Sequence, residues 1–526
     1  MTVSDDAMSR AVGAIDPDVA QLHQLGYAQE LRRRMGGFSN FAVSFTIISI
    51  LSGCLTLYGY GLTTGGPVDM VWGWLLVGGM TTVVGLGMAE VCSAYPTAGG
   101  LYYWAAKLAK RNTGAWSWFT GWFNMLGQVA ITAGIDFGMA LFLTALLNLT
   151  TGFTATRDHT VWVYAGILLA HGLLNTFGIR VVAFLSDVSV WWHILGVTLI
   201  ALVLLIVPSH HATASFLFTD FVNKTGFSSG FYVFMIGLLM AQYTFTGYDA
   251  SAHLTEETRS PATSGPKGIV SSIIVSLVAG FILILGITYA IHLDYNSALT
   301  SATGVPPAQI FIDAIGRHGG ELLLLVAIVA QFYCGMASVT ANSRMIYAFS
   351  RDGAVPGHRF WHRINPRTRT PTNSIWFAAV GAFILGVPYI WSAVAYGAVT
   401  SIATIGLYIA YVIPTLLRRL KGDEFEKGPW HLGRWSPLIG WLGVAWVFVI
   451  TILFMLPEVG PFSSISWRTF NYAPIAVGVV VLYSGIFWLV SARKWFTGPK
   501  AQGDEAELRA IESEFTHIQT ELEEVD

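Results

Sequence analysis

Two polar, glycine-containing stretches interrupt segments of the chain that are otherwise apolar. Residues 49–61 read SILSGCLTLYGYG, and residues 242–249 read QYTFTGYD before the chain becomes polar through Ser251, His253 and Glu256. A helix inside a lipid bilayer satisfies its own backbone, so a break is tolerated only where protein or water covers the freed groups. We therefore predict that both stretches unwind inside a membrane protein, where their freed backbone can hold a ligand.

The composition of the chain is that of an integral membrane protein. Of its 526 residues, 54% are hydrophobic and only 11% are charged, whereas a soluble protein carries about 25% charged residues. The composition excludes a disordered chain and a basic nucleic-acid-binding domain. The lipid bilayer is thus an expected partner, and nucleic acid is not. Three scattered cysteines provide neither a disulfide framework nor a metal site, and we expect no metal and no cofactor.

Windows of about 19 residues divide the apolar part of the chain into twelve predicted membrane spans. The fold class is therefore all-α. The predicted spans cover residues 40–63, 70–95, 115–148, 161–178, 187–208, 230–256, 267–291, 320–349, 374–388, 390–416, 437–456 and 472–492. The first 38 residues contain no apolar core, so they do not resemble a signal peptide.

An even number of spans places both termini on one side of the membrane. If that side is the cytoplasm, the predicted external loops contain only four of the 29 Lys and Arg residues, namely Arg157, Lys224, Arg317 and Arg468. Such a bias satisfies the positive-inside rule. We predict a multi-pass protein of the plasma (inner) membrane with cytoplasmic N- and C-termini, and we leave its oligomeric state open.

The last 24 residues form a separate acidic segment. Residues 503–526 carry nine Asp or Glu and one Arg. Apolar residues recur in steps of three and four, which predicts an amphipathic helix; they are Leu508, Ile511, Phe515, Ile518, Leu522 and Val525. The helix either docks on the cytoplasmic face of the bundle or pairs with a second chain. Docking is favoured because fewer than three heptads are short for a coiled coil.

The two interrupted stretches fall in the first and the sixth span, which correspond if the chain repeats every five spans. Because five is odd, the second copy is inverted, and matched breaks in inverted repeats indicate a transporter site near the bilayer midplane. Glycine also serves close helix packing, a role that suits Gly134 and Gly138. The expected parts are residues 1–38 (cytoplasmic), 39–208 (first repeat), 230–416 (inverted repeat), 437–492 (helices 11 and 12) and 503–526 (acidic tail).

Three spaced motifs resemble the signature of the amino acid, polyamine and organocation (APC) superfamily of permeases. They are AEVCSAYPTAGGLY at 89–102, GYD at 247–249 with EETRSP at 256–261, and SR at 343–344 with RDGAVP at 351–356. The chain is most similar to the amino acid and choline transporter branch, through LYGYG at 57–61 and VWWH at 190–193. The resemblance spans about residues 27 to 495, in family order.

The resemblance implies a LeuT-type fold, with five plus five inverted spans and two extra helices, that works by alternating access. Substrate is then expected between the broken first and sixth helices. A half-helix N-terminus would receive a carboxylate, carbonyl groups near residues 243–245 would receive an ammonium, and aromatic faces could add cation–π contacts. The implied substrate-binding residues are Ser52, Gly53, Cys54, Leu55, Tyr243, Thr244, Phe245, Gly247, Tyr248 and Asp249.

Two residues are candidates for binding a coupling proton. His193 matches the position in the fifth span where many proton-coupled relatives carry a lysine, and histidine can titrate near physiological pH. The alternative is a neutral histidine that bonds a carbonyl of the first span. Asp249 follows the break in the sixth span, where it could meet an amine or a proton, or instead cap the freed backbone.

Other polar residues have expected roles around these two. Glu256 and Glu257 are expected to cap or gate against Arg259 or Arg344. An alternative sodium site would combine carbonyl groups of the first span with Ser338 or Thr340. In the third span, a stripe of polar residues is expected to border water or other helices: Asn124, Gln128, Thr132 and Asp136. His171 and Asn175 are interpreted as packing residues.

The predicted function is secondary active transport, with proton-coupled uptake of a small zwitterionic or cationic substrate. A small amino acid or 4-aminobutyrate is preferred because the first break offers carboxylate donors, which choline would leave unused. The alternatives are sodium-coupled or exchange transport of choline or a polyamine, or a channel or receptor on the same scaffold. The chain lacks a GxxxxGK[ST] loop, which argues against an ATP-driven pump. We expect that the protein is not an enzyme.

Overall fold

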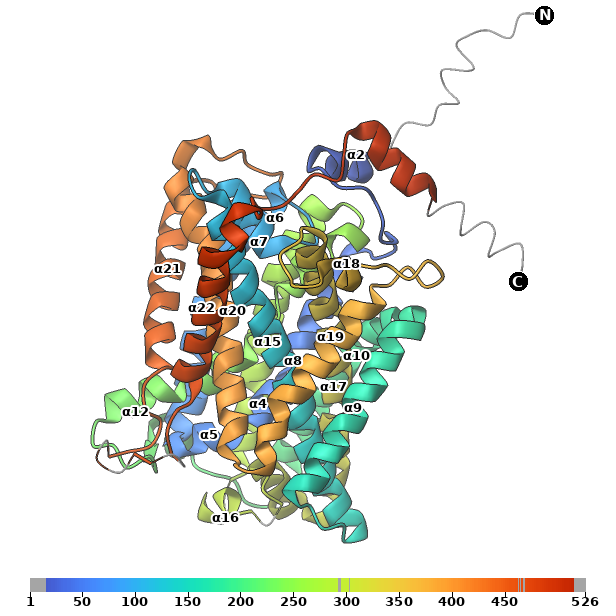
Figure 1. The fold of residues 1–526 in the computed structure, drawn as a ribbon. Helices are drawn as coiled ribbons and strands as arrows, with labels where there is room; N and C mark the ends of the chain where they lie inside the picture. The colour runs from blue at the N-terminus through green and yellow to red at the C-terminus, as the bar shows by residue number, and fades with distance from the viewer. Residues whose placement is uncertain are drawn as a thin grey trace, which may run out of the picture.

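The computed structural model describes residues 16–514 apart from 292–294, 302, 462, 464 and 467–468. It is a bundle of α-helices (Figure 1). Eleven helices in this part of the chain are long and apolar enough to cross a membrane, and a shorter apolar pair covers Gly230–Thr244. The predicted all-α membrane fold is confirmed, and the shorter pair stands where the sixth of the twelve spans was predicted.

The long helices run in chain order through the bundle. They are α6 (Trp74–Ala94), α8 (Thr113–Thr151), α9 (Arg157–Phe177), α10 (Ile179–Ile206), α15 (Pro261–Tyr289), α17 (Pro306–Arg351), α19 (Thr372–Gly386), α20 (Val394–Lys421), α21 (Ser436–Leu453) and α22 (Ala473–Val490). Within α17, Gly316 has non-helical backbone angles and marks a kink. The helix α8 packs against α7, α9, α17, α19 and α20, so it lies at the centre of the bundle.

Shorter elements complete the fold. The first span consists of α3 (Gly37–Ile48), α4 (Ile50–Thr56) and α5 (Tyr58–Thr63). The sixth span consists of α12 (Gly230–Gly237), α13 (Leu239–Thr244) and α14 (Ala250–His253). The remaining helices are α2 (Pro17–Gln24), α7 (Gly100–Leu108), α11 (Ala214–Thr219), α16 (Tyr295–Leu299), α18 (His358–Trp361), the π-helix η1 (Asp69–Gly73) and the 3-10 turns η2 (Thr255–Glu257) and η3 (Val387–Ile390). Strands β1 (Thr64–Gly65) and β2 (Val222–Asn223) pair antiparallel.

Both predicted interruptions are present. In the sixth span α13 ends at Thr244, and Gly247 adopts a left-handed conformation (φ 88°), which glycine reaches without steric cost. In the first span the left-handed residue is Ser49 (φ 35°), between α3 and α4. The break thus lies at the first residue of the predicted stretch 49–61, and Gly53 itself lies inside α4.

Gly53 serves close packing instead. A methyl group at Gly53 would lie 2.8 Å from the Cα atom of Thr244, so α4 and α13 approach each other here with no room for a side chain. The two interrupted spans thus lie side by side, in contact through α4 and α13.

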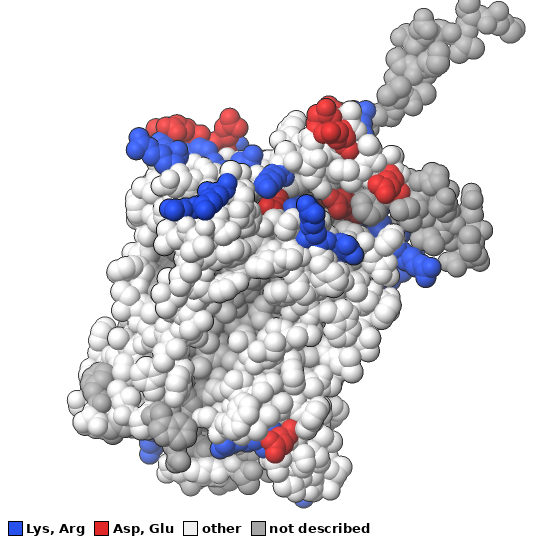
Figure 2. Space-filling view, in the orientation of Figure 1, with Lys and Arg blue, Asp and Glu red and all other residues white. Residues whose placement is uncertain are grey.

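Charged side chains gather at the two ends of the bundle, and the surface between them is largely uncharged (Figure 2). Exposed large apolar residues cover the peripheral helices, for example Phe448 on α21 and Leu482 on α22. An apolar belt between charged ends fits a protein whose waist faces lipid.

Both described ends of the chain lie at one end of the bundle, which we call the termini face; α5, α12 and α16 lie at the opposite face (Figure 1). At the termini face residues 23–30 bind residues 500–512, and we call this pairing the terminal clasp. Gln502 donates its backbone N–H to the Gly26 carbonyl (2.8 Å), and the Gln29 N–H donates to the Glu512 carboxylate (2.7 Å). Residues 505–514 are helical and Leu508 is buried, whereas Phe515, Ile518, Leu522 and Val525 of the predicted tail helix lie outside the described residues.

Candidate functional site

The backbone freed by the break in the sixth span is held by side chains of other helices. The Tyr408 hydroxyl of α20 donates to the Phe245 carbonyl (2.5 Å). The Gly247 N–H donates to the Tyr411 hydroxyl (3.2 Å), also on α20. From α3, Ser44 donates to the Tyr248 carbonyl (3.0 Å). Three hydroxyl groups therefore replace the helical hydrogen bonds that the unwound segment gives up.

Asp249 is fully buried beside this break. Its carboxylate accepts hydrogen bonds from the Tyr411 hydroxyl (2.7 Å) and the Gln128 amide (2.6 Å), with the Asn124 amide at 3.4 Å. The His253 ring Nε2 lies 3.3 Å from the same carboxylate. Because Tyr411 bridges Asp249 and the Gly247 N–H, the carboxylate anchors the break, as the capping interpretation requires.

The break in the first span is held by His193. The Ser49 hydroxyl lies 2.7 Å from His193 Nε2, and His193 Nδ1 lies 2.8 Å from the Ser189 carbonyl of its own helix. A carbonyl only accepts, so Nδ1 carries the proton and Nε2 is left to accept from Ser49. The partner in the first span is thus the hydroxyl of the break residue and not a carbonyl. The Cys334 thiol of α17 donates to the nearby Ile47 carbonyl (3.2 Å).

The predicted carboxylate donors lie one turn beyond the break. The N–H groups of Ser52 and Gly53 both donate to the Ser49 carbonyl (2.8 Å), and Cys54 and Leu55 lie further inside α4. The positive end of this half-helix is its first residues, Ile50 and Leu51. The structure thus moves the start of the predicted donor set from residue 52 to residue 50.

The aromatic residues of the sixth span pack against neighbours. The Phe245 ring lies 4.5 Å from the Trp74 ring, and the Tyr248 ring lies 4.8 Å from the Tyr411 ring, measured between centroids. Tyr243 is buried, and a methyl group at Gly134 of α8 would lie 2.5 Å from its hydroxyl. The Tyr396 hydroxyl donates to the carbonyl of the same Gly134 (3.2 Å).

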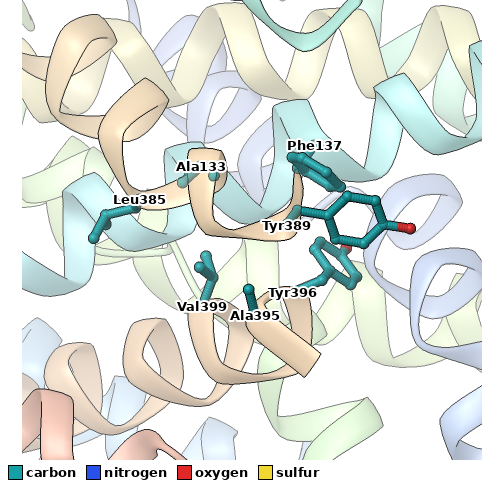
Figure 3. A pocket seen from close by; sticks show the side chains of 8 residues that line it. Ala133, Phe137, Leu385, Tyr389, Ala395, Tyr396 and Val399 are labelled. Atoms are coloured by element: carbon teal, nitrogen blue, oxygen red, sulfur yellow. The ribbon is translucent and has the colours of Figure 1, made fainter. Parts of the chain in front are cut away.

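A small pocket lies beside Tyr396 and is shown in Figure 3. Aromatic rings from three elements gather on one side of it: Phe137 of α8, Tyr389 of η3 and Tyr396 of α20. The centroids of Phe137 and Tyr389 are 4.6 Å apart, and those of Phe137 and Tyr396 are 5.5 Å apart.

Two ion pairs close the termini face of the site. The Arg344 guanidinium lies 2.8 Å from the Glu257 carboxylate, which is one of the expected contacts. Glu256 pairs with neither expected arginine: it lies 3.3 Å from Arg351 and accepts the Ala98 N–H (3.0 Å). The prediction for Glu256 was wrong because the η2 turn points consecutive carboxylates in different directions.

The hydroxyl groups of the alternative sodium site bond elsewhere. Ser338 lies 2.8 Å from the Thr132 hydroxyl of α8, and Thr340 donates to the Asn175 side chain of α9 (2.6 Å). Among the described residues, neither hydroxyl has a hydrogen bond to the first span.

Some buried groups were not foreseen from the sequence. His171, interpreted as a packing residue, lies 3.2 Å from the Asp136 carboxylate. Tyr408 and Tyr411 hold the break from the tenth span, and their spacing of three on one helix face is the signal that could have indicated this. Asp69, also buried, follows a Gly-Gly-Pro turn that reads as an exposed loop.

Comparisons with known proteins find a matching family and several relatives. The model of a family described as "Amino acid permease" matches residues 35–482. The chain is 45% identical to the amino-acid permease BAT1 of Arabidopsis thaliana, over 93% of this chain and 97% of that protein. It is 44% identical to the BAT1 homologue of Oryza sativa subsp. japonica, over 94% and 97%. It is 31% identical to the GABA-specific permease of Saccharomyces cerevisiae, over 91% and 85%.

Proposed function

This chain belongs to the amino acid permease family, and from that premise we propose that it takes up a small amino acid or 4-aminobutyrate with a coupling proton. The observation that carries the proposal is the pair of interrupted spans packed side by side, with Gly53 of α4 against Thr244 of α13. Matched breaks of this kind are where secondary transporters bind substrate.

In the proposed complex the substrate lies between the two breaks. Its carboxylate meets the positive end of α4 at Ile50 and Leu51, ahead of Ser52 and Gly53, whose N–H groups already donate to the Ser49 carbonyl. Its ammonium meets carbonyl groups at the C-terminal end of α13, where the helix dipole is negative. These are the Thr244 carbonyl and the Tyr243 carbonyl, which also accepts from the Thr246 hydroxyl (2.7 Å). The Phe245 carbonyl already accepts from Tyr408, so Phe245, Gly247, Tyr248 and Asp249 shape the site through their backbone and packing.

A substrate with a separated carboxylate and ammonium fits two half-helix ends of opposite sign. A yeast relative is named a GABA-specific permease, which supports 4-aminobutyrate as one substrate to test. Purified protein in sealed vesicles is expected to exchange at least one labelled amino acid or 4-aminobutyrate across the membrane. A panel in which none is exchanged would contradict the proposal.

The termini face is proposed to be cytoplasmic, in the plasma (inner) membrane. Basic residues are concentrated there (Figure 2). The end of α17 and the residues that follow it carry Arg351, Arg359, Arg363, Arg367 and Arg369. The positive-inside rule assigns such a face to the cytoplasm. With this orientation, the Glu257–Arg344 and Glu256–Arg351 pairs close the inner side of the site, and they must part before substrate is released inside.

His193 is proposed to bind the coupling proton, because its Nε2 atom is hydrogen-bonded to Ser49, the residue at which the first span breaks. A second proton on Nε2 would turn this nitrogen from an acceptor into a donor and force the Ser49 hydroxyl to reorient. Protonation is thereby coupled to the conformation of the first span.

Replacing His193 with alanine is expected to reduce accumulation driven by an inward proton gradient at least about tenfold, to the level of equilibration, because the proton no longer shares the transport step. Exchange of labelled for unlabelled substrate at equal pH is expected to persist. His159→Ala, at an exposed histidine, is the matched control. Intact proton-driven accumulation by His193→Ala would contradict the assignment, and accumulation that follows sodium would favour the sodium alternative.

Replacing Glu257 with glutamine is expected to destabilise the closed inner side by about 3 kcal/mol, because it leaves the buried Arg344 charge without its carboxylate. The measurement is thermal unfolding of the purified protein. Glu424→Gln removes a carboxylate from an exposed pair with Lys110 and is expected to change little. Equal unfolding curves for the two variants would contradict a closing role for Glu257.

A further inference from the structure

Asp69 is a buried carboxyl group without a hydrogen-bonding partner. It begins the π-helix η1 at the opposite face and is only 1% exposed. Neither of its two carboxylate oxygens has a hydrogen-bond partner among the described residues. Short π-helical segments are frequent at functional sites, and an unpaired carboxylate inside a membrane protein requires an explanation.

Backbone atoms from three spans enclose this carboxyl group. A methyl group at Gly73 would lie 2.6 Å from Asp69 Oδ1, and one at Gly65 would lie 2.6 Å from the Asp69 Cβ atom. A methyl group at Gly237, the last residue of α12, would collide with both Asp69 Oδ2 and the Thr64 carbonyl oxygen. Asp69 Oδ2 and the Thr64 carbonyl oxygen therefore both lie against Gly237.

The titratable groups described around Asp69 provide no positive charge to balance its ionised form. The titratable side chains facing the region are phenols and a carboxyl: Tyr60 of α5, Tyr232 of α12, Tyr295 of α16 and Glu458 in the loop after α21. Burial raises the pKa of Glu458 to about 7. The charged residues Asp220 and Lys224, in the segment that follows α11, are exposed. The ion pairs among the described residues do not include Asp69. An ionised Asp69 here would be an uncompensated buried charge, which costs several kcal/mol.

Asp69 lies at the seam between the halves of the broken spans at this face. The Tyr60 hydroxyl of α5 donates to the Ile236 carbonyl of α12 (3.0 Å), and β1 extends α5 to Thr64. In the proposed orientation this seam is the outer gate, which must open before substrate enters. Opening it moves Gly237 away from Thr64 and lets water reach Asp69.

We propose that Asp69 is a proton-binding site that closes the outer gate. In the closed state the carboxylic acid keeps its proton and donates a hydrogen bond to the Thr64 carbonyl oxygen. When α5 and α12 separate, the carboxyl group is hydrated and releases this proton to the outer solution, and it must take up a proton from the same side before the gate closes again. External acidity therefore sets the rate of closure, and this proton is not carried across. The proposal rests on the proposed transport function, but not on His193 as the coupling residue.

The test is substrate exchange in vesicles at fixed internal pH, with the external pH varied from about 5.5 to about 8.5, on either side of neutrality. The rate of substrate exchange by the unaltered protein is expected to fall about tenfold as the external pH rises over this range. Asp69→Asn, which keeps a donor for the Thr64 carbonyl and cannot ionise, is expected to lose most of this tenfold decline, so that only the pH dependence caused by the coupling proton remains. Asp220→Asn, at an exposed carboxylate of the same face, is the matched control and is expected to keep the unaltered profile.

A pH profile of Asp69→Asn equal to that of the unaltered protein would overturn the proposal and leave the transport function standing. Failure of the unaltered protein to exchange any amino acid would instead contradict the proposed function. Infrared spectroscopy of the unaltered protein decides the case if Asp69→Asn does not reach the membrane. The expected result is a protonated carboxyl band that persists at about pH 8, where exposed carboxyls are ionised; the absence of any such band would overturn the proposal.

Discussion

Replacing Gly53 with valine is expected to abolish uptake while the protein still reaches the membrane. The first added carbon would lie 2.8 Å from the Thr244 Cα atom, and a backbone atom cannot move aside as a flexible side chain can. The two interrupted spans must then separate at the point where the proposed site forms. Overpacking of this kind costs about 1–3 kcal/mol, and the loss of uptake is expected to exceed about tenfold, since binding needs both half-helix ends at once.

The matched control is Gly79→Val, because an added carbon at Gly79 of α6 meets nothing within 4 Å. The measurement is uptake of the preferred substrate, normalised to the amount of protein in the membrane. Normal uptake by Gly53→Val would mean that substrate does not bind between α4 and α13.

Replacing Asp249 with alanine is expected to destabilise the protein and to stop transport. The substitution leaves the Tyr411 hydroxyl and the Gln128 amide as buried donors without an acceptor, at about 1–3 kcal/mol each. Tyr411 also holds the Gly247 N–H, so the break in the sixth span loses its anchor. Thermal unfolding and substrate exchange are the two measurements.

Asp249→Asn is expected to have a thermal stability and an exchange rate between those of Asp249→Ala and the unaltered protein. Its amide oxygen can still accept a hydrogen bond from one of the two donors. Asp158→Ala, at an exposed carboxylate near the start of α9, is the matched control and is expected to unfold like the unaltered protein. If Asp249→Ala unfolds at the same temperature as this control, Asp249 does not anchor the break.

The sequence predicts the spans and the unwinding of the sixth span well because these depend on local chemistry. Hydropathy shows where a segment can meet lipid, and Gly247 supplies the left-handed backbone that the break uses. In the first span the same reasoning selects Gly53, although the structure unwinds at Ser49. A glycine can provide backbone freedom or close approach, and only the neighbouring helix decides which one is used.

Partners across the bundle are the part that sequence could not predict. Tyr411 lies 162 positions after Asp249 in the chain, and nothing local indicates that they meet. The pairing of Glu256 with Arg351 depends on how the η2 turn orients two adjacent carboxylates. The burial of Asp69 likewise depends on glycines of three spans and is invisible in the turn that precedes it.

The terminal clasp holds the two ends of the chain together. Its hydrogen bonds join Gly26, Ala28 and Gln29 of the N-terminal segment to Gln502 and Glu512 of the C-terminal segment. It also reaches the bundle, since the Lys500 N–H donates to Asp352 (3.3 Å), whose pKa burial raises to about 6. A pair of fluorophores attached on the two sides of the clasp, within the described residues, would consequently report energy transfer between them. A fall in that transfer during turnover would show that the clasp opens.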